Sequence, residues 1–310
     1  MPEARSRVLD TMARSAELLG LALLLAILPA RAGAQPLPYS WQPAPPTTGH
    51  RLVDRIPPPA GYQRPPLPPG SFGDWLRGLP LLPGRPPVLL YDGSPKGRQD
   101  VHEAVLDLDV GQRDLQQCAD LVIRLRAEYL WAAGRAAAIA FQFTSGDVAA
   151  WRQWQDGVRP VVQGGTKVTW SRTARRDGSY ASFRRYLDRV FTYAGSRSLA
   201  RELTTVADAR RLRVGDVVVQ GGSPGHAVIL IDVAQRPGPD GEPERLWLLA
   251  QSYMPAQQPH VLRNLADPAP SPWFRIDLPA SPLVTPEWTF RGAPLRTWPD
   301  VAPATPAPPR

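Results

Sequence analysis

The chain has 310 residues, 36 Lys and Arg against 28 Asp and Glu, a formal net charge of +8, and a hydrophobic content of 43%. That length and apolar content suffice for a packed core, and the single cysteine excludes an internal disulfide. The basic residues form no dense run and no nucleic-acid fingerprint, so we expect no nucleic-acid partner.

The first 34 residues have the order of a secretory signal peptide. Basic residues from Arg5 to Arg14 precede an apolar run over 18–28, and an A-x-A site ends at Ala34. The run is shorter than the roughly 20 residues that span a bilayer as a helix. We therefore predict a signal peptide over 1–34, a periplasmic or secreted mature protein, and no stable membrane anchor after cleavage.

Two segments of the predicted mature chain are rich in proline. About a third of residues 35–70 are proline, which prevents persistent helix or central strand, so this segment is a linker that acts as a tether or an extended wrap. Residues 296–310 have the same character and predict a disordered tail. We expect both segments to add little to the core and the folded domain to cover 71–295.

Within the domain, the strongest helix is predicted over 114–131. Asp114 is its expected cap, with Gln117 three residues later, and the apolar positions share one helical face. Arg124 and Glu128 form an i, i+4 pair on another face. Helices are also expected over 72–79, 148–155 and 180–195, and strands over 87–91, 104–110, 138–144, 161–170, 216–220, 226–233 and 245–251. One major helix followed by a run of strands predicts an α+β domain with an antiparallel sheet.

Three residues form a candidate catalytic group. Cys118 falls in the first turn of the major helix, where unpaired N–H groups and the helix dipole favour a thiolate and lower its pKa. His226 opens a strand after the glycine-rich turn at 221–225. A symmetric hairpin between 226–232 and 245–251 places His226 opposite Gln251, whose amide is then able to orient the imidazole.

These residues carry two resemblances. The runs GDVVV from Gly215 and GHAVI from Gly225 resemble the Gly-Asp and Gly-His strands of NlpC-type and CHAP-type papain-like cell-wall hydrolases. That likeness implies a papain-like fold, Cys118 as nucleophile, His226 as base, Gln251 as orienting residue, and peptidoglycan or another envelope peptide as substrate. Over nearly the whole domain, the chain is similar to an exported bacterial family of unknown function, by DLQQCAD from Asp114, RLRAEYL from Arg124 and MPAQ from Met254.

The same residues have simpler readings. Cys118 shares a helical stripe with apolar side chains, so an inert buried thiol is an alternative, and His226 is alternatively a structural histidine. A metal site at His102, Asp107 and Asp109 is weighed against solvent-facing or capping carboxylates and not adopted. The tryptophans either line a glycan groove or pack in the core, the second being favoured. We expect a cysteine peptidase or amidase without metal or cofactor; the alternative is a non-catalytic envelope-binding protein on the same scaffold.

Overall fold

The computed structural model describes residues 36–299. The predicted signal peptide over 1–34 and residues 300–310 of the predicted tail lie outside the described residues. Within 36–299, no helix is long and apolar enough to cross a membrane.

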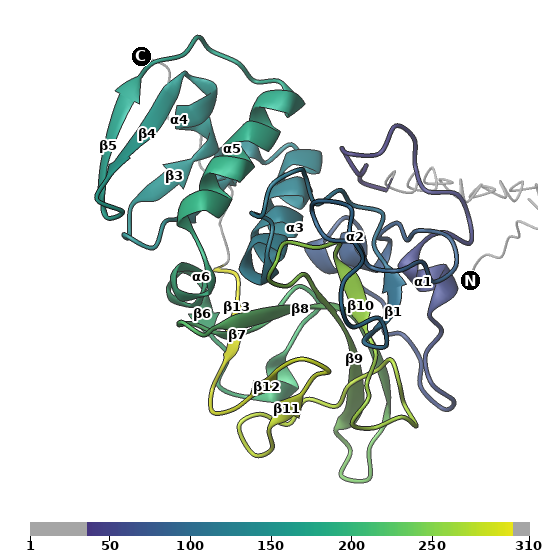
Figure 1. Ribbon diagram of the computed structural model, residues 1–310. Coiled ribbons are helices and arrows are strands. Elements are labelled where there is room, and N and C mark those ends of the chain that lie inside the picture. The colour runs from purple at the N-terminus through teal and green to yellow at the C-terminus, as the bar shows by residue number, and fades with distance from the viewer. Residues whose placement is uncertain (1–35, 300–310) are drawn as a thin grey trace, which may run out of the picture. The chain divides into compact units, whose positions relative to one another are not determined.

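The described chain is a mixed α+β structure around an antiparallel sheet (Figure 1). The sheet has seven strands in the order β1-β10-β9-β8-β7-β13-β6, and every neighbouring pair in it is antiparallel. These strands are β1 (His102–Val105), β6 (Thr204–Thr205), β7 (Val217–Gln220), β8 (His226–Pro237), β9 (Pro243–Gln251), β10 (His260–Leu262) and β13 (Leu295–Thr297). Strand β8, which lies between β9 and β7, is buried over its first nine residues.

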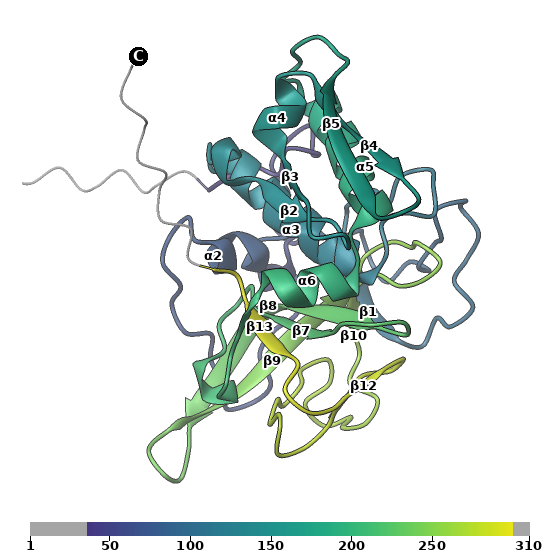
Figure 2. The same ribbon diagram turned by 90° about the vertical axis from the view of Figure 1, so that its left-hand side faces the viewer.

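The helices and three short strand pairs complete the fold. The helical elements are α1 (Leu52–Arg55), α2 (Phe72–Arg77), α3 (Cys118–Ala132), η1 (Ala136–Ala138), α4 (Trp151–Gln155), α5 (Tyr180–Tyr193), α6 (Ser196–Glu202) and η2 (Ala209–Arg211). The short pairs are β2 (Ala140–Gln142) with β3 (Val148–Ala150), β4 (Val158–Gln163) with β5 (Lys167–Arg172), and β11 (Leu283–Val284) with β12 (Thr289–Phe290). Helices α2 and α3 pack against β8 (Figure 2).

The major helix begins four residues later than predicted. Gln117 is its N-cap, and the Asp120 carboxylate accepts a hydrogen bond from the Gln117 backbone N–H at 3.1 Å. Asp114 is therefore not the cap. Its carboxylate instead accepts hydrogen bonds from the Gln117 side-chain amide at 2.9 Å and from the Ala256 N–H at 2.7 Å. As a result, Cys118 is the first residue of α3.

The predicted hairpin between β8 and β9 is present, but the register that we predicted for it is wrong. The strands pair Ile229 with Ala250 and Leu230 with Leu249, and an irregularity before Asp232 shifts the pairing beyond it. Continued through Ile229 and Ala250, this register sets Val228 opposite Gln251. His226 and Gln251 are then diagonal neighbours on the same face of the sheet, which still lets their side chains meet.

The proline-rich segment contributes to the core, contrary to our expectation. Tyr39, Leu52 and Ile56 are buried within the main hydrophobic cluster. Arg64 forms an ion pair of 2.6 Å with the fully buried Asp232 of β8. Proline prevents long regular elements there but does not prevent an extended wrap from packing, so the segment is not a detached linker. The tail boundary also moves, because β13 extends over residues 295–297.

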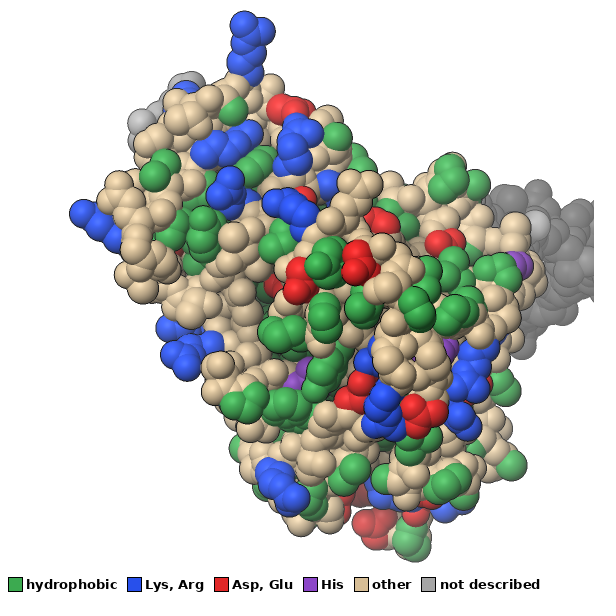
Figure 3. Space-filling model, viewed as in Figure 1, with side chains coloured by type: hydrophobic (Ala, Val, Ile, Leu, Met, Phe, Trp, Pro, Cys, Tyr) green, Lys and Arg blue, Asp and Glu red, His purple; other side chains and the backbone are tan. Residues whose placement is uncertain are grey.

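Several shorter elements differ from the predictions. Residues 87–91 form no named strand, and the strand expected over 104–110 is replaced by β1 at 102–105. The strand expected over 161–170 is part of a hairpin, β4 and β5, because Gly164 and Gly165 both have positive φ and turn the chain. Lys and Arg side chains gather on the face over α5 and this hairpin (Figure 3).

Candidate active site

Cys118 lies at the wall of a cleft of about 760 Å³. The start of α3, the loop between β7 and β8, and residues near Tyr253 and Trp288 line this cleft. The Cys118 residue is half-buried, and its thiol is within hydrogen-bonding reach of the Ala227 backbone N–H, directly after His226. The fold therefore brings the predicted nucleophile and the predicted base to one cleft.

The resting thiol does not have the low pKa that the helix start predicts. Burial raises the pKa of Cys118 to about 11, and the nearby Asp120 carboxylate acts in the same direction. The N–H groups of Ala227, Ala119 and Cys118 itself favour the thiolate, as we expected from the helix start, but they are outweighed. At neutral pH the resting group is a thiol rather than a thiolate.

His226 and Gln251 are in direct contact. The His226 Nε2 atom lies 2.9 Å from the Gln251 Oε1 atom, and both residues are buried. Burial lowers the pKa of His226 to about 4; the hydrogen bond to Gln251 opposes this shift and the charge of Lys96 adds to it. The imidazole is thus neutral at pH 7. Among residues 36–299, no hydrogen bond joins its ring to the Cys118 thiol.

Aromatic side chains enclose the imidazole. Its ring centroid lies 4.8 Å from that of Tyr253, 5.4 Å from that of Trp288, and 5.8 Å from that of Phe290, which stacks on it. Trp288 and Phe290 belong to the β11–β12 hairpin. This hairpin lies over the start of β8 and limits the positions open to the ring.

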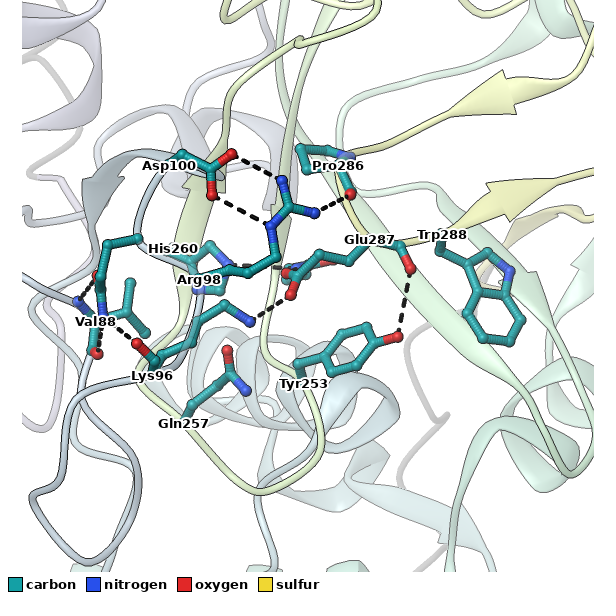
Figure 4. A network of polar contacts seen from close by, with 12 residues as sticks. Val88, Lys96, Arg98, Asp100, Tyr253, Gln257, His260, Pro286, Glu287 and Trp288 are labelled. Atoms are coloured by element: carbon teal, nitrogen blue, oxygen red, sulfur yellow. Dashed lines mark hydrogen bonds and ion pairs between the residues drawn. The ribbon is translucent and has the colours of Figure 1, made fainter.

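A second layer of polar groups lies behind Gln251. Its Nε2 atom donates to Glu287 Oε2 at 2.8 Å and lies 3.3 Å from His260 Nε2. The other carboxylate oxygen of Glu287 lies 2.5 Å from Lys96 Nζ (Figure 4). The hydrogen-bonded series therefore runs from the imidazole through the amide to a partly buried ion pair.

The sequence segments around Cys118 and Met254 meet in the structure. Besides the bond from the Ala256 N–H to Asp114, the Ser252 hydroxyl oxygen lies 2.6 Å from the carbonyl oxygen of Gln257 and 3.0 Å from that of Gln116. These bonds fix the loop after β9 against the start of α3. Two separated sequence signatures thus build one wall of the cleft.

Two of the three residues weighed as a metal site have other partners. His102 Nε2 lies 2.9 Å from the Pro86 carbonyl oxygen, and Asp109 forms ion pairs with Arg124 and Arg184. In the described part of the chain, no group of three or more His, Cys, Asp or Glu residues is arranged to hold a metal ion. Trp151 and Trp154 are buried, as expected for core packing.

Sequence reasoning missed the residues that support the contact between His226 and Gln251. Lys96, His260 and Glu287 come from three separate loops or strands, and no periodicity or turn signal marks them. Pro286 and Trp288 flank Glu287, but a single acidic residue in such a segment is uninformative without its spatial neighbours. Only the signature at 254–257 pointed to this side of the cleft.

The family model described as Domain of unknown function (4846) matches residues 52–297. The chain belongs to this family. The match spans α1 to β13 and so includes the start of α3, the β8–β9 hairpin and Glu287. No curated protein and no solved structure matches the chain.

Proposed function

We propose that this member of the family is a papain-like cysteine hydrolase of the cell envelope that cleaves peptide or amide bonds of peptidoglycan. Cys118 is the nucleophile, His226 the general base, and Gln251 the residue that orients the imidazole. The observation that carries the proposal is the hydrogen bond of 2.9 Å between His226 and Gln251 at the cleft that Cys118 lines.

The chemistry starts from a neutral pair. The Cys118 sulfur attacks the carbonyl carbon while its proton passes to the free Nδ1 of His226, and the imidazolium then protonates the leaving nitrogen as the C–N bond breaks. A water molecule attacks the resulting thioester and gives its proton to Nδ1. The C–S bond breaks, and the thiol recovers that proton. Neither metal nor cofactor enters this sequence.

The cleft chemistry favours a substrate without strong negative charge. The described residues that line the cleft include no Lys or Arg, whereas Asp114, which carries a carboxyl group, is among them. Tyr253, Met254 and Trp288 supply apolar surface at the same cleft. A short peptide or amide suits this lining better than a polyanion, and the envelope location rests on the predicted signal peptide and the sequence resemblance.

A specific observation favours the second candidate, a non-catalytic envelope-binding protein. Burial raises the pKa of Cys118 to about 11 and lowers that of His226 to about 4, so the two groups are strongly biased against exchanging a proton at rest. If ligand binding does not reverse that bias, the cleft binds envelope peptides without cleaving them.

Digestion of insoluble peptidoglycan separates the two functions. The purified protein is incubated with peptidoglycan, and new amino groups and new reducing ends are quantified in the soluble fraction. We expect amino groups to appear without reducing ends, and the Cys118→Ala variant to lower the rate by at least about 100-fold. No release by the wild type, or equal release by the variant, overturns the hydrolase. Co-sedimentation of both proteins without any release establishes the binding function instead.

A further inference from the structure

We propose that Glu287 is a positioning residue that orients the Gln251 amide and thereby holds His226 as its Nε2–H tautomer, with Nδ1 free to act as the base. The role in catalysis rests on the proposed function, but the orientation itself does not. Lys96, His260 and Glu287 lie together in the polar network of Figure 4.

His260 sets the first constraint. Its Nδ1 atom lies 2.9 Å from the carbonyl oxygen of Gln258, which only accepts hydrogen bonds, so Nδ1 carries the proton. Burial lowers the pKa of His260 to about 3, so the ring is neutral and Nε2 has a free lone pair. The Gln251 side chain meets this lone pair at 3.3 Å.

Glu287 sets the second constraint. Its Oε2 atom lies 2.8 Å from the same end of the Gln251 side chain, and a carboxylate paired with Lys96 only accepts. Two acceptors therefore face one end of the amide, which must be the NH₂ group with its two donors. Rotating the amide by 180° points its carbonyl oxygen at both acceptors and costs both hydrogen bonds.

The tautomer of His226 follows from these constraints. With its NH₂ group held by Glu287 and His260, Gln251 presents Oε1 to the imidazole at 2.9 Å. An amide oxygen accepts, so His226 Nε2 must carry the proton. Nδ1 then keeps its lone pair, and it has no hydrogen-bond partner among the described residues.

The turn that carries Glu287 is held at several points. Arg98 Nη1 donates to the Pro286 carbonyl at 2.8 Å, and the Thr285 hydroxyl donates to the Trp288 carbonyl at 2.8 Å. Lys96 is 7% exposed and the Glu287 side chain 11%, so their contact is well shielded from solvent. Such support is what a residue needs to orient a neighbour, because a mobile carboxylate does not select one amide rotamer.

Long-range ¹H–¹⁵N NMR of the histidine rings tests this proposal without a substrate. The chain has four histidines, so ring signals are assignable by single substitutions. We expect wild-type His226 to be almost entirely the Nε2–H tautomer. In the Glu287→Leu variant, which removes one acceptor, we expect that population to fall to about half. Glu287→Gln retains an acceptor oxygen for Gln251 and should restore the wild-type tautomer.

The outcomes separate this inference from the proposed function. An Nδ1–H tautomer in the wild type overturns the inference even if the Glu287→Leu variant fails to fold, and so does an unchanged tautomer in a folded Glu287→Leu variant. Glu244→Leu is the matched control. Glu244 pairs with Arg236 near the turn of the β8–β9 hairpin, far along the strands from His226, so its loss should leave the His226 tautomer unchanged. If the Glu287 variants change the His226 tautomer as expected but the protein does not cleave peptidoglycan, the inference is supported and only the proposed hydrolase function is overturned.

Discussion

Helix α3 contributes to two buried polar clusters, one with paired charges and one whose groups are held in their neutral forms. At Arg124, a fully buried guanidinium contacts Glu128 at 2.7 Å, Gln116 at 3.0 Å and Asp109 at 3.2 Å. At Cys118, one turn and a half earlier, burial instead favours the neutral forms of the thiol, of Asp120 and of His226.

The difference separates a structural cluster from a reactive one. The Arg124 cluster joins α3 to Tyr180 of α5, whose hydroxyl donates to Glu128 at 2.7 Å, and its charges compensate one another. Each cluster has a buried carboxylate oxygen without a hydrogen-bond partner among the described residues, Glu128 Oε2 and Asp120 Oδ1, but Glu128 is paired with a cation whereas Asp120 forms no ion pair within residues 36–299. Buried groups with perturbed pKa values and free lone pairs are typical of functional sites.

Breaking the Arg124 cluster should have the largest effect on stability. Arg124→Met leaves Glu128 buried without its cation, and we expect the free energy of unfolding in urea to fall by about 3–5 kcal/mol. Arg113→Met, at an exposed pair with Asp188, should cost less than about 1 kcal/mol. A similar small loss for both variants would remove the distinction between the clusters.

The proline-rich segment at 35–70 takes part in a third buried cluster of charged side chains. Asp232 contacts Arg64 at 2.6 Å and Arg77 at 2.7 Å. Asp232→Asn removes the charge that both guanidinium groups share, and we expect a loss of about 3 kcal/mol in urea unfolding. An unchanged unfolding midpoint would mean that the proline-rich segment contributes little, as the sequence suggested.

The Cys118 cluster should respond to acid through His226. Its pKa is about 4 in the folded protein and 6.5 as a model value, so the unfolded chain binds more protons between these values and stability is lost as pH falls from 6.5 to 4. The His226→Gln variant lacks this dependence. We expect the stability difference between wild type and variant to change by about 2 kcal/mol in favour of the variant from pH 7 to 4.5. A difference independent of pH contradicts the lowered pKa.

Glu202 gives an effect of opposite sign and similar size. Burial raises its pKa from 4.5 to about 7, so the unfolded state loses its proton first and stability falls as pH rises through this window. Its Oε2 accepts from the Gln142 N–H at 3.0 Å, a bond that glutamine retains. At pH 8 we expect Glu202→Gln to be more stable than wild type by about 3 kcal/mol in thermal melting, and equal to it at pH 4.

The sequence predicted the elements better than it predicted their junctions. The helix at 118–132 and the strands at 217–251 follow from apolar periodicity, which burial enforces. The cap was wrong because Asp114 bonds to Ala256, far along the chain. The β8–β9 register was wrong because the strands pair as far as Pro237 and Pro243, so the turn lies later in the chain than a symmetric hairpin around 226–251 assumes. The contact between His226 and Gln251 nevertheless formed, because a two-residue offset keeps both side chains on one face.

The site was predictable where chemistry coincided with local structure. Cys118 at a helix start and His226 at a strand start were visible in the sequence, and the cleft contains both. Glu287, His260 and Lys96 were not, since they converge only through the fold of the β11–β12 hairpin and the loop before β1. The direction of the shift in the Cys118 pKa was also missed, because burial depends on the elements that surround the helix and not on the helix itself.

Alkylation of Cys118 by iodoacetamide tests most directly whether His226 serves this thiol. The rate is followed at pH 7 in the folded wild type and in His226→Gln, which retains a polar group near Gln251 but has no base at Nδ1. A thiol with a pKa of about 11 reacts slowly by itself, whereas transfer of its proton to Nδ1 speeds the attack. We predict that the wild type labels at least about tenfold faster than the variant. Equal rates, or labelling of either protein only after denaturation, would contradict a functional pair of Cys118 and His226.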